Sequence, residues 1–228
     1  FKVFFYSIFL SAQDESFLLV LGNVQDGGIP HMACKKDCCM SLTEKEKRVL
    51  KITSLAFIDK SDSKHYLFEA STDITEQLNF LDQITGNKSE LDGIFLTHAH
   101  MGHYSGLLQL GREAMGAKNI PVYVMPKMSE FLKSNAPWSQ LVLLNNIKLK
   151  SLAENQLIKV SNRLHVSSII VPHRDEFSET VGFFIKGRRK TAFFLPDIDK
   201  WGKWDKSLKN ILEKVDYAFL DGTFFDSA

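Results

Sequence analysis

Three histidines within six residues constrain this chain more than any other feature. His98, His100 and His103 form the pattern H-x-H-x-x-H. The apolar run at residues 93–96 predicts a strand before them, and residues 104–111 predict a helix after them. Side chains two apart on a strand point the same way, and His103 can turn back toward them from the start of the helix. Neutral imidazole is a good ligand for zinc, iron, manganese and nickel, so we favour a metal site over a chance cluster.

Polar side chains also follow three later predicted strands. His173 follows residues 164–171, Asp197 follows residues 191–195, and Asp221 lies directly after residues 217–220. Loops at one end of a sheet usually carry function. We therefore expect His173 and Asp197 to complete the metal site that the three clustered histidines begin. The remaining histidines within predicted strands are interpreted as structural: His65 and His165.

The order of predicted elements indicates a layered α/β fold, with sheets inside and helices outside. Residues 52–58 and 65–70 predict a hairpin, and residues 74–84 predict a helix capped by Asp73. Residues 141–144 predict a strand and residues 201–215 a helix. Because no repeat or linker divides the chain, we expect one domain over residues 13–228.

The composition limits the classes of molecule that this protein is expected to bind. An apolar fraction of 44% and a charged fraction of 24% are ordinary for a globular protein. The net charge of +1 provides no field for nucleic acid or an anionic membrane, so we expect a small-molecule substrate and no nucleic acid. The basic run at residues 186–190 predicts a solvated hairpin turn rather than a phosphate site. A homodimer is compatible with these expectations.

The first residues resemble the end of a secretory signal peptide, with Lys2, an apolar stretch and then small residues. We expect residues 1–12 to be this remnant; a first β-strand is the alternative. A signal peptide would make the protein secreted or periplasmic, with no membrane segment after cleavage. Without one, the protein would be cytoplasmic. The chain also ends soon after a predicted strand, and we expect a C-terminal portion of the fold to be missing.

All cysteines lie in one short loop. Residues 22–30 are glycine-rich and predict a turn. This turn is equally well interpreted as a wall of the active site or as a turn without a role there. Cys34, Cys38 and Cys39 follow, and their tight spacing favours a structural zinc with His31 or another histidine as fourth ligand. Free thiols, or a single disulfide in an oxidising compartment, are the alternative.

These motifs together resemble the metallo-β-lactamase superfamily, an αβ/βα sandwich with the signature H-x-H-x-D-H followed by a His, an Asp and a last His at strand ends. His98, His100 and His103 match the first motif, His173 the next histidine, and Asp197 the metal-bridging aspartate. Glu69 stands in the place of the family's first acidic motif. With Asp73, it is a candidate to support the metal ligands, although capping suffices for Asp73.

The chain resembles most the branch of that superfamily that contains PQQ synthesis protein B and phosphoribosyl cyclic phosphodiesterases. Residues 22–39 match its glycine-rich turn and clustered cysteines, with different cysteine spacing. Residues 68–74, 171–175 and 221–223 are also similar. The resemblance implies a structural zinc at the cysteine loop. It also implies one or two active-site zinc ions, with iron or manganese as alternatives.

Two departures weaken the second metal site. Gly102 replaces the aspartate of the signature, and no histidine follows His173. The first site keeps His98, His100, His173 and Asp197, while the second keeps only His103 and Asp197. From the sequence we therefore expect at most one tightly bound ion.

The expected function is a metal-dependent hydrolase acting on a phosphodiester or a cyclic phosphate. Three histidines with an open fourth position lower the pKa of a bound water to about 7. Asp197 would orient that water or accept its proton. Arg174 would neutralise an anionic substrate, or equally form an ion pair with Asp175 or Glu176. Two alternatives remain open: an iron-dependent oxidative enzyme, and a catalytically inactive binding protein of the same fold.

Overall fold

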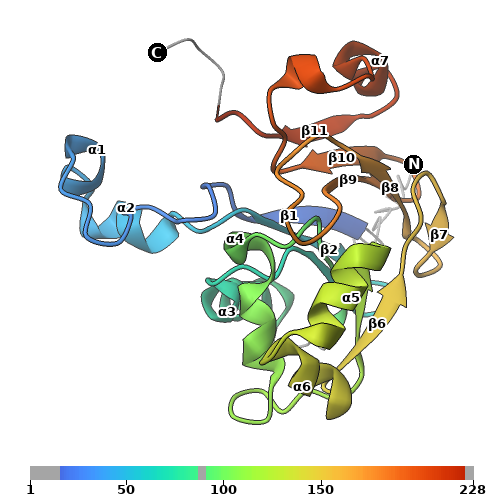
Figure 1. Cartoon of the computed structure of the whole chain (residues 1–228), viewed down its shortest axis with the longest axis horizontal. Coiled ribbons are helices and arrows are strands. Elements are labelled where there is room, and N and C mark those ends of the chain that lie inside the picture. Colours follow the sequence, from blue (N-terminus) through green and yellow to red (C-terminus); the bar gives the residue numbers. More distant parts are fainter. Residues whose placement is uncertain (1–15, 87–90, 224–228) are drawn as a thin grey trace, which may run out of the picture.

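The strands of the chain form two sheets (Figure 1). The computed structural model describes residues 16–86 and 91–223, so the predicted signal segment at residues 1–12 lies outside the described residues. The six-stranded sheet contains, in spatial order, β1 (Ser16–Gly22), β2 (Ser54–Asp59), β3 (Lys64–Phe68), β4 (Leu91–Phe95), β5 (Ile120–Val124) and β6 (Ile147–Ser151). The five-stranded sheet contains β11 (Tyr217–Leu220), β10 (Thr191–Leu195), β9 (Val181–Lys186), β8 (His165–Ile170) and β7 (Ile158–Lys159).

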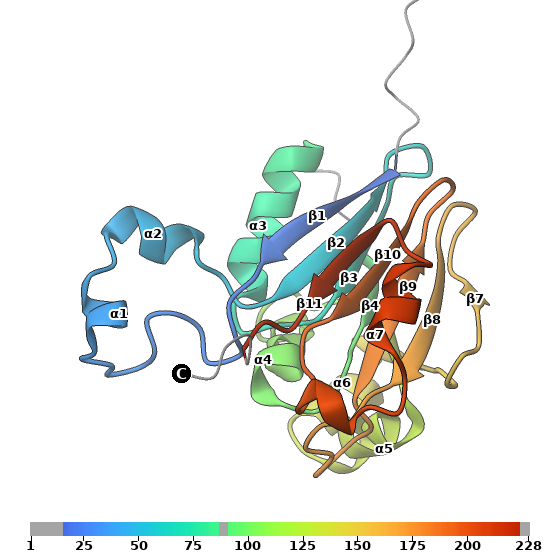
Figure 2. The ribbon, with the colours of Figure 1, turned by 90° about the horizontal axis from the view of Figure 1, so that it is seen from above.

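Helices cover the outer face of each sheet (Figure 2). One apolar cluster joins the six-stranded sheet to α3 (Ile74–Thr85), α4 (Met101–Tyr104), the 3-10 helix η2 (Ser105–Leu110), α5 (Pro126–Ser134) and α6 (Trp138–Leu143). Another joins the five-stranded sheet to η3 (Trp201–Lys203) and α7 (Leu208–Leu212). The predicted αβ/βα sandwich of four layers is therefore confirmed.

The core between the sheets is aromatic. Successive side chains of a strand face opposite sides, so on β4 Ile94 packs toward the helices and Phe95 toward the other sheet. The Phe95 ring stacks on Phe68 with centroids 4.8 Å apart and meets Phe183 of β9 edge-on at 5.7 Å. Buried rings of this size contribute much of the packing energy that fixes one sheet against the other.

Strand direction collects several strand ends at one place. β4 lies parallel to β3, so their carboxyl ends share an edge of the six-stranded sheet. β8 and β10 both run antiparallel to β9 and therefore run the same way as each other. The residues after β3, β4, β8 and β10 are those from which the sequence predicted a site.

The middle of the segment between β1 and β2 projects away from both sheets (Figures 1 and 2). It contains α1 (Asp37–Met40) and α2 (Glu44–Val49). α2 begins with a capping box: the Thr43 hydroxyl accepts from the Glu46 N–H at 3.2 Å, and the Glu46 carboxylate accepts from the Thr43 N–H at 2.8 Å. Among the described residues, no helix combines the length and apolarity needed to cross a membrane.

Most predicted elements are found, and three predictions are wrong. Residues 141–144 belong largely to helix α6, because only Leu141 of this short apolar run is buried and Leu143 is 79% exposed. The helix predicted over residues 201–215 is divided into η3 and α7, the latter capped by Ser207. Asp73 precedes α3, but its carboxylate accepts from the Ile52 N–H at 2.8 Å instead of capping the helix. The basic run does form the predicted turn, closed by Gly187 N–H donating to the Lys190 carbonyl.

Candidate metal centre

Four side chains from both sheets bring donor atoms to one point. His98 and His100 follow β4, His173 follows β8 and Asp197 follows β10. His100 Nδ1 lies 2.9 Å from His98 Nε2 and 3.2 Å from His173 Nε2. Asp197 Oδ2 lies 3.5 Å from His98 Nε2 and 3.4 Å from His173 Nε2. The structure thus brings together the residues that the sequence assigned to the first metal site.

The spacing of these atoms fits a tetrahedral ion. Ligand atoms about 2.0–2.1 Å from a zinc ion lie roughly 3.3 Å apart in tetrahedral geometry. The four measured separations, from 2.9 to 3.5 Å, fall around that value. Three imidazoles and one carboxylate are also a donor set that zinc, iron and manganese accept.

Neighbouring side chains fix the orientation of these imidazoles. Thr97 Oγ1 lies 2.8 Å from His98 Nδ1, and Glu176 accepts from His100 Nε2 at 3.1 Å. The Ala99 N–H donates to Ser178 Oγ at 2.8 Å, which ties the histidine loop to the β8–β9 loop. Partners on the far nitrogen set the tautomer, so the nitrogens left to face the common point are His98 Nε2 and His100 Nδ1.

His103 lies on the other side of Asp197, within α4. Its Nε2 is 3.5 Å from Asp197 Oδ1, and its Nδ1 is 3.6 Å from Glu69 Oε2. Asp197 therefore presents one oxygen to each histidine group. The His103 and Glu69 side chains are fully buried, and neither ring nitrogen of His103 has a hydrogen-bond partner in the described part of the chain.

Burial and charge shift the pKa values of this cluster. Burial, assisted by the charge of His103, lowers the pKa of His98 to about 3, which keeps its imidazole neutral. Burial would also lower the pKa of His103, but the carboxylates of Glu69 and Asp197 outweigh it and raise that pKa to about 10. Burial opposes ionisation of Asp197, yet the imidazoles of His103, His173 and His98 hold its pKa well below the usual range.

The structure adds one residue that the sequence did not assign. Asp26, in the glycine-rich loop after β1, offers a carboxylate oxygen that forms a group with His103 and Asp197, all three ligand atoms lying within 4.8 Å of one another. Of the two readings of this loop, the structure therefore favours a wall of the site. The only sequence signal was an aspartate beside glycines, in a chain whose histidine motif has lost its own aspartate.

Asp221 supports the loop that carries Asp197. Its carboxylate accepts from the N–H groups of Ile198 at 3.2 Å and Thr223 at 2.7 Å. Its own N–H donates to the Leu195 carbonyl at 2.8 Å. The third polar strand end thus positions the site rather than adding a ligand, and neither His65 nor His165 belongs to the clustered donor groups.

The cysteines form a separate group on the projecting segment. The sulfur atoms of Cys34, Cys38 and Cys39 lie within 4.8 Å of one another, and all three residues are free thiols. His31 does not join them, because its ring contacts the side chain of Gln25. A zinc ion here would take three thiolates and a fourth ligand from elsewhere.

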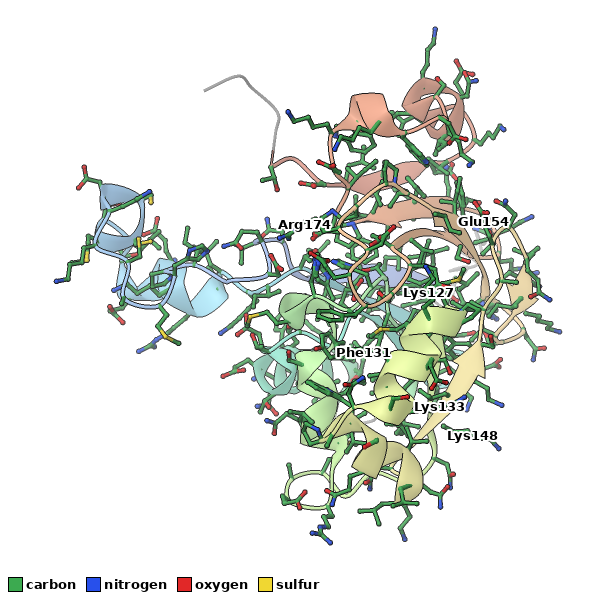
Figure 3. The ribbon with its side chains drawn as sticks, viewed as in Figure 1. Lys127, Phe131, Lys133, Lys148, Glu154 and Arg174 are labelled. Carbon is green, nitrogen blue, oxygen red and sulfur yellow. The ribbon has the colours of Figure 1, made fainter. Side chains whose placement is uncertain are left out.

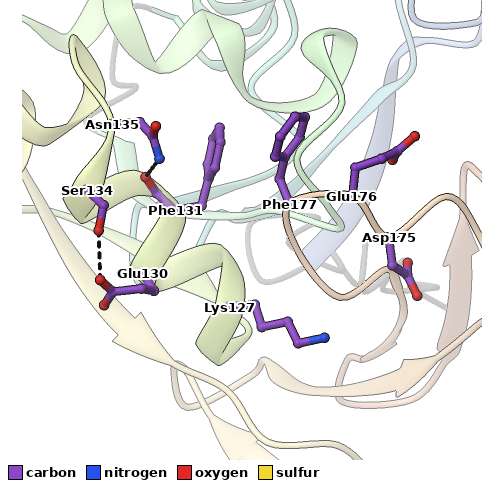
Figure 4. A pocket seen from close by; sticks show the side chains of 8 residues that line it. All are labelled: Lys127, Glu130, Phe131, Ser134, Asn135, Asp175, Glu176 and Phe177. Atoms are coloured by element: carbon purple, nitrogen blue, oxygen red, sulfur yellow. Dashed lines mark hydrogen bonds between the residues drawn. The ribbon is translucent and has the colours of Figure 1, made fainter.

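An open pocket of about 500 Å³ adjoins the metal centre between α5 and the β8–β9 loop (Figure 4). Glu176 lines it and also binds His100, which links the pocket to the site. Phe131 and Phe177 form an aromatic pair with centroids 5.4 Å apart, beside Lys127. Arg174 is exposed on the same loop (Figure 3); the hydrogen bond with His100, and less strongly the Arg174 charge, lowers the pKa of Glu176.

Comparison with known proteins identifies the class. The family model described as a beta-lactamase superfamily domain matches residues 64–228, and the chain therefore belongs to that superfamily. No curated protein sequence matches the chain significantly.

Solved structures share the fold. The Zn²⁺-bound PqqB of Methylobacterium extorquens has a TM-score of 0.75 and 21% identity, covering 92% of this chain and 73% of its own. A diphosphatase of the PhnP family has a TM-score of 0.59 and 22% identity, and the match covers 82% of this chain and 68% of the diphosphatase. The metallo-beta-lactamase fold protein YhfI of Bacillus subtilis has a TM-score of 0.53 and 16% identity, and the match covers 79% of this chain and 62% of YhfI.

Proposed function

We propose that this protein is a metal-dependent hydrolase of a small phosphodiester or cyclic phosphate. The observation that carries the proposal is the cage formed by His98, His100, His173 and Asp197, whose donor atoms have the separations of a tetrahedral ion site. A metal ion bound there would supply a water of lowered pKa and a Lewis acid for the phosphoryl oxygen.

The chain's own residues would orient the reaction. Because three imidazoles hold its pKa low, Asp197 is a poor proton acceptor and is better suited to ligation and orientation. The aromatic pair Phe131–Phe177 offers a wall for an apolar or aromatic substituent of the substrate. Lys127 of α5 lines the pocket, and Arg174 is exposed on the β8–β9 loop that forms its other side; both cations would attract the anionic group.

Three carboxylates line the pocket, and those of Asp175 and Glu176 on the β8–β9 loop have hydrogen-bond partners. Glu176 accepts a hydrogen bond from His100, and Asp175 accepts one from the Thr180 hydroxyl at 2.9 Å. Both are thus engaged in holding the loop. The carboxylates keep their charge, and a bound metal ion beside the pocket would offset it for an anionic substrate.

The test is hydrolysis of bis-p-nitrophenyl phosphate by the purified chain, before and after chelation. We expect turnover that chelator abolishes and that added Zn²⁺ or Mn²⁺ restores. Asp197→Ala should lower kcat/KM at least about 100-fold, because it removes a ligand of the cage. Asp62→Asn, at an exposed turn, is the matched control and should not change the rate. Absence of chelator-sensitive turnover on this substrate and on ester, lactam and thioester panels would refute the proposal.

Iron-dependent oxidation is the second candidate, and the donor set is what favours it. Imidazole and carboxylate ligands without thiolate also suit iron, and metal availability rather than affinity decides which ion such a site holds. Metal analysis separates the two candidates: stoichiometric iron with oxygen consumption supports oxidation, and zinc or manganese without oxygen consumption supports hydrolysis.

A further inference from the structure

The glycine-rich loop brings an aspartate to the place where the histidine motif lacks one. The base of the loop is anchored near the start of β2, where the N–H groups of Asn23 and Val24 donate to the Lys51 carbonyl at 3.0 and 3.1 Å. Its turn is closed by Gly28 N–H donating to the Gln25 carbonyl at 2.9 Å. Asp26 lies within this turn, so its backbone position is defined on both sides.

Gly102 is what allows Asp26 to approach. A Cβ atom at position 102 would lie 2.0 Å from the Asp26 Cβ and 2.4 Å from its Cα, closer than real Cβ atoms come to other atoms. Any side chain at position 102 would therefore displace the loop. An aspartate at 102 and the observed position of Asp26 exclude each other, so the missing carboxylate and the approach of the loop are one structural feature.

His103 supplies an independent indication of a ligand. The residue is fully buried, and both ring nitrogens lack hydrogen-bond partners among the described residues. The carboxylate oxygen that faces Nε2, Asp197 Oδ1, lies 3.5 Å away, which is too long for a hydrogen bond but close to the roughly 3.3 Å between two ligand atoms of one tetrahedral ion. The Nε2 atom lies on the side of Asp197 Oδ1, while Asp197 Oδ2 belongs to the first cage.

We propose that Asp26, His103 and Asp197 form a second divalent-cation site, bridged to the first by the two oxygens of Asp197. Asp26 provides from the β1–β2 segment the carboxylate that Gly102 cannot provide from the histidine motif. Two carboxylates and one imidazole favour a hard or borderline ion such as Mn²⁺ or Zn²⁺. The inference rests on the proposed metal centre, through Asp197, but not on the proposed reaction.

The experiment counts Mn²⁺ ions bound by the metal-free full chain in calorimetric titration. Mn²⁺ is chosen because thiolates select softer ions, so the cysteine group does not enter the count. We expect two ions in the wild-type protein, with the spectrum of a spin-coupled pair in electron paramagnetic resonance. Asp26→Asn should keep the first ion and weaken the second at least about tenfold, since even loss of a residue that only supports a ligand costs that much.

Two further variants address the geometry. Gly102→Ala changes none of the ligand residues but should also lose the second ion, because its Cβ displaces Asp26. Asp26→Gly combined with Gly102→Asp moves the carboxylate to the histidine motif and should recover the second ion. Asp62→Asn, an equivalent change at an exposed turn, should bind two ions.

The outcomes are distinguishable. One ion in the wild-type protein would overturn the second site alone, and no ion would overturn the proposed metal centre as well. Two ions with unchanged affinity in Asp26→Asn would show that Asp26 is not a ligand. If Asp26→Asn fails to fold, the coupled-pair spectrum of the wild-type protein and the double variant still decide the matter, and an uncoupled spectrum would refute the bridged site.

Discussion

Glu69 is the buried carboxylate that lies behind the His103 imidazole. It follows β3 with a φ of 80°, a backbone conformation that non-glycine residues seldom adopt. Its N–H donates to the Phe95 carbonyl at 2.9 Å, and its buried carboxylate lies 3.6 Å from His103 Nδ1. A carboxylate behind an imidazole raises the basicity of the nitrogen on the opposite side, so Glu69 would strengthen His103 as a ligand.

We expect Glu69→Gln to weaken the ion held by His103 by about 10–100-fold, because the amide preserves the shape but not the charge. Mn²⁺ titration of the metal-free protein measures the change. Glu76→Gln, an exposed position on α3, is the control and should leave the affinity unchanged. Equal Mn²⁺ affinities in wild type and Glu69→Gln would contradict the role given to Glu69.

Gly106 is a second residue whose size matters to the site. Its N–H donates to the Ala70 carbonyl at 2.9 Å, and the Ala70 N–H donates to the His103 carbonyl at 2.8 Å. A Cβ at position 106 would lie 2.0 Å from the Ser71 carbonyl oxygen. The end of β3 and the turn that carries His103 therefore meet without room for a side chain.

Gly106→Ala should lower the free energy of unfolding of the metal-free protein by about 1–3 kcal/mol, the usual cost of overpacking. Urea denaturation measures it. Gly202→Ala provides the matched control, because nothing lies within 4 Å of a Cβ at that exposed glycine. A loss no larger than that of the control would show that the β3 end can move aside.

Among the elements, residues 31–50 of the projecting segment, which carry α1 and α2, bury little of their apolar surface. Of residues 31–50 only Cys39 is buried, while Met32, Met40 and Val49 are 97%, 66% and 69% exposed. Segments with so little buried apolar surface need another source of order, and a metal ion can supply it. The three cysteine sulfurs are the groups placed to bind one.

We expect this segment to bind one zinc ion through Cys34, Cys38 and Cys39. A mercurial reagent that reacts with thiolates should release one equivalent of zinc, read by a colorimetric chelator, while zinc bound by histidine and aspartate is retained. Cys38→Ala should abolish the release, whereas Ser41→Ala in the same segment should not. Release of no zinc from the zinc-loaded wild-type protein would contradict the prediction.

At the scale of the whole molecule, the candidate metal centre joins the two sheets. Three of its histidines follow β4 of the six-stranded sheet, whereas His173 and Asp197 follow strands of the five-stranded sheet. An ion bound by both groups would close one end of the sandwich, whose middle is already fixed by Phe95 and Phe183. Unfolding would then require release of the ion.

Saturating Mn²⁺ should therefore raise the melting temperature. At a thousand times Kd, a ligand specific to the folded state adds about 4 kcal/mol, or roughly 8–16 °C for a chain of this size. Calorimetry of the metal-free and metal-loaded protein measures the shift. Asp197→Ala should remove most of this rise in melting temperature. Equal melting temperatures of the wild-type protein with and without Mn²⁺ would show that the ion does not join the sheets.

Long periodic elements were predictable, and short apolar runs were not. The helix predicted over residues 74–84 is α3, and the hairpin of residues 52–58 and 65–70 is β2–β3. Both have a clear period and a turn or boundary signal. Residues 141–144 are four apolar residues without a helical or strand period, so the sequence did not distinguish the two conformations. In the folded chain they belong largely to α6, which buries Leu141 alone among them.

The sequence by itself determined the superfamily fold and the candidate metal ligands that share a motif or follow an apolar strand. His98, His100, His103, His173 and Asp197 carry that signal because strand direction places the ends of buried strands together. Only the tertiary structure decided that Asp26 joins His103, since no spacing rule relates a loop after β1 to a motif after β4. The physical reason is steric: the space that a side chain at Gly102 would fill is occupied by Asp26, and that exclusion exists only in the folded chain.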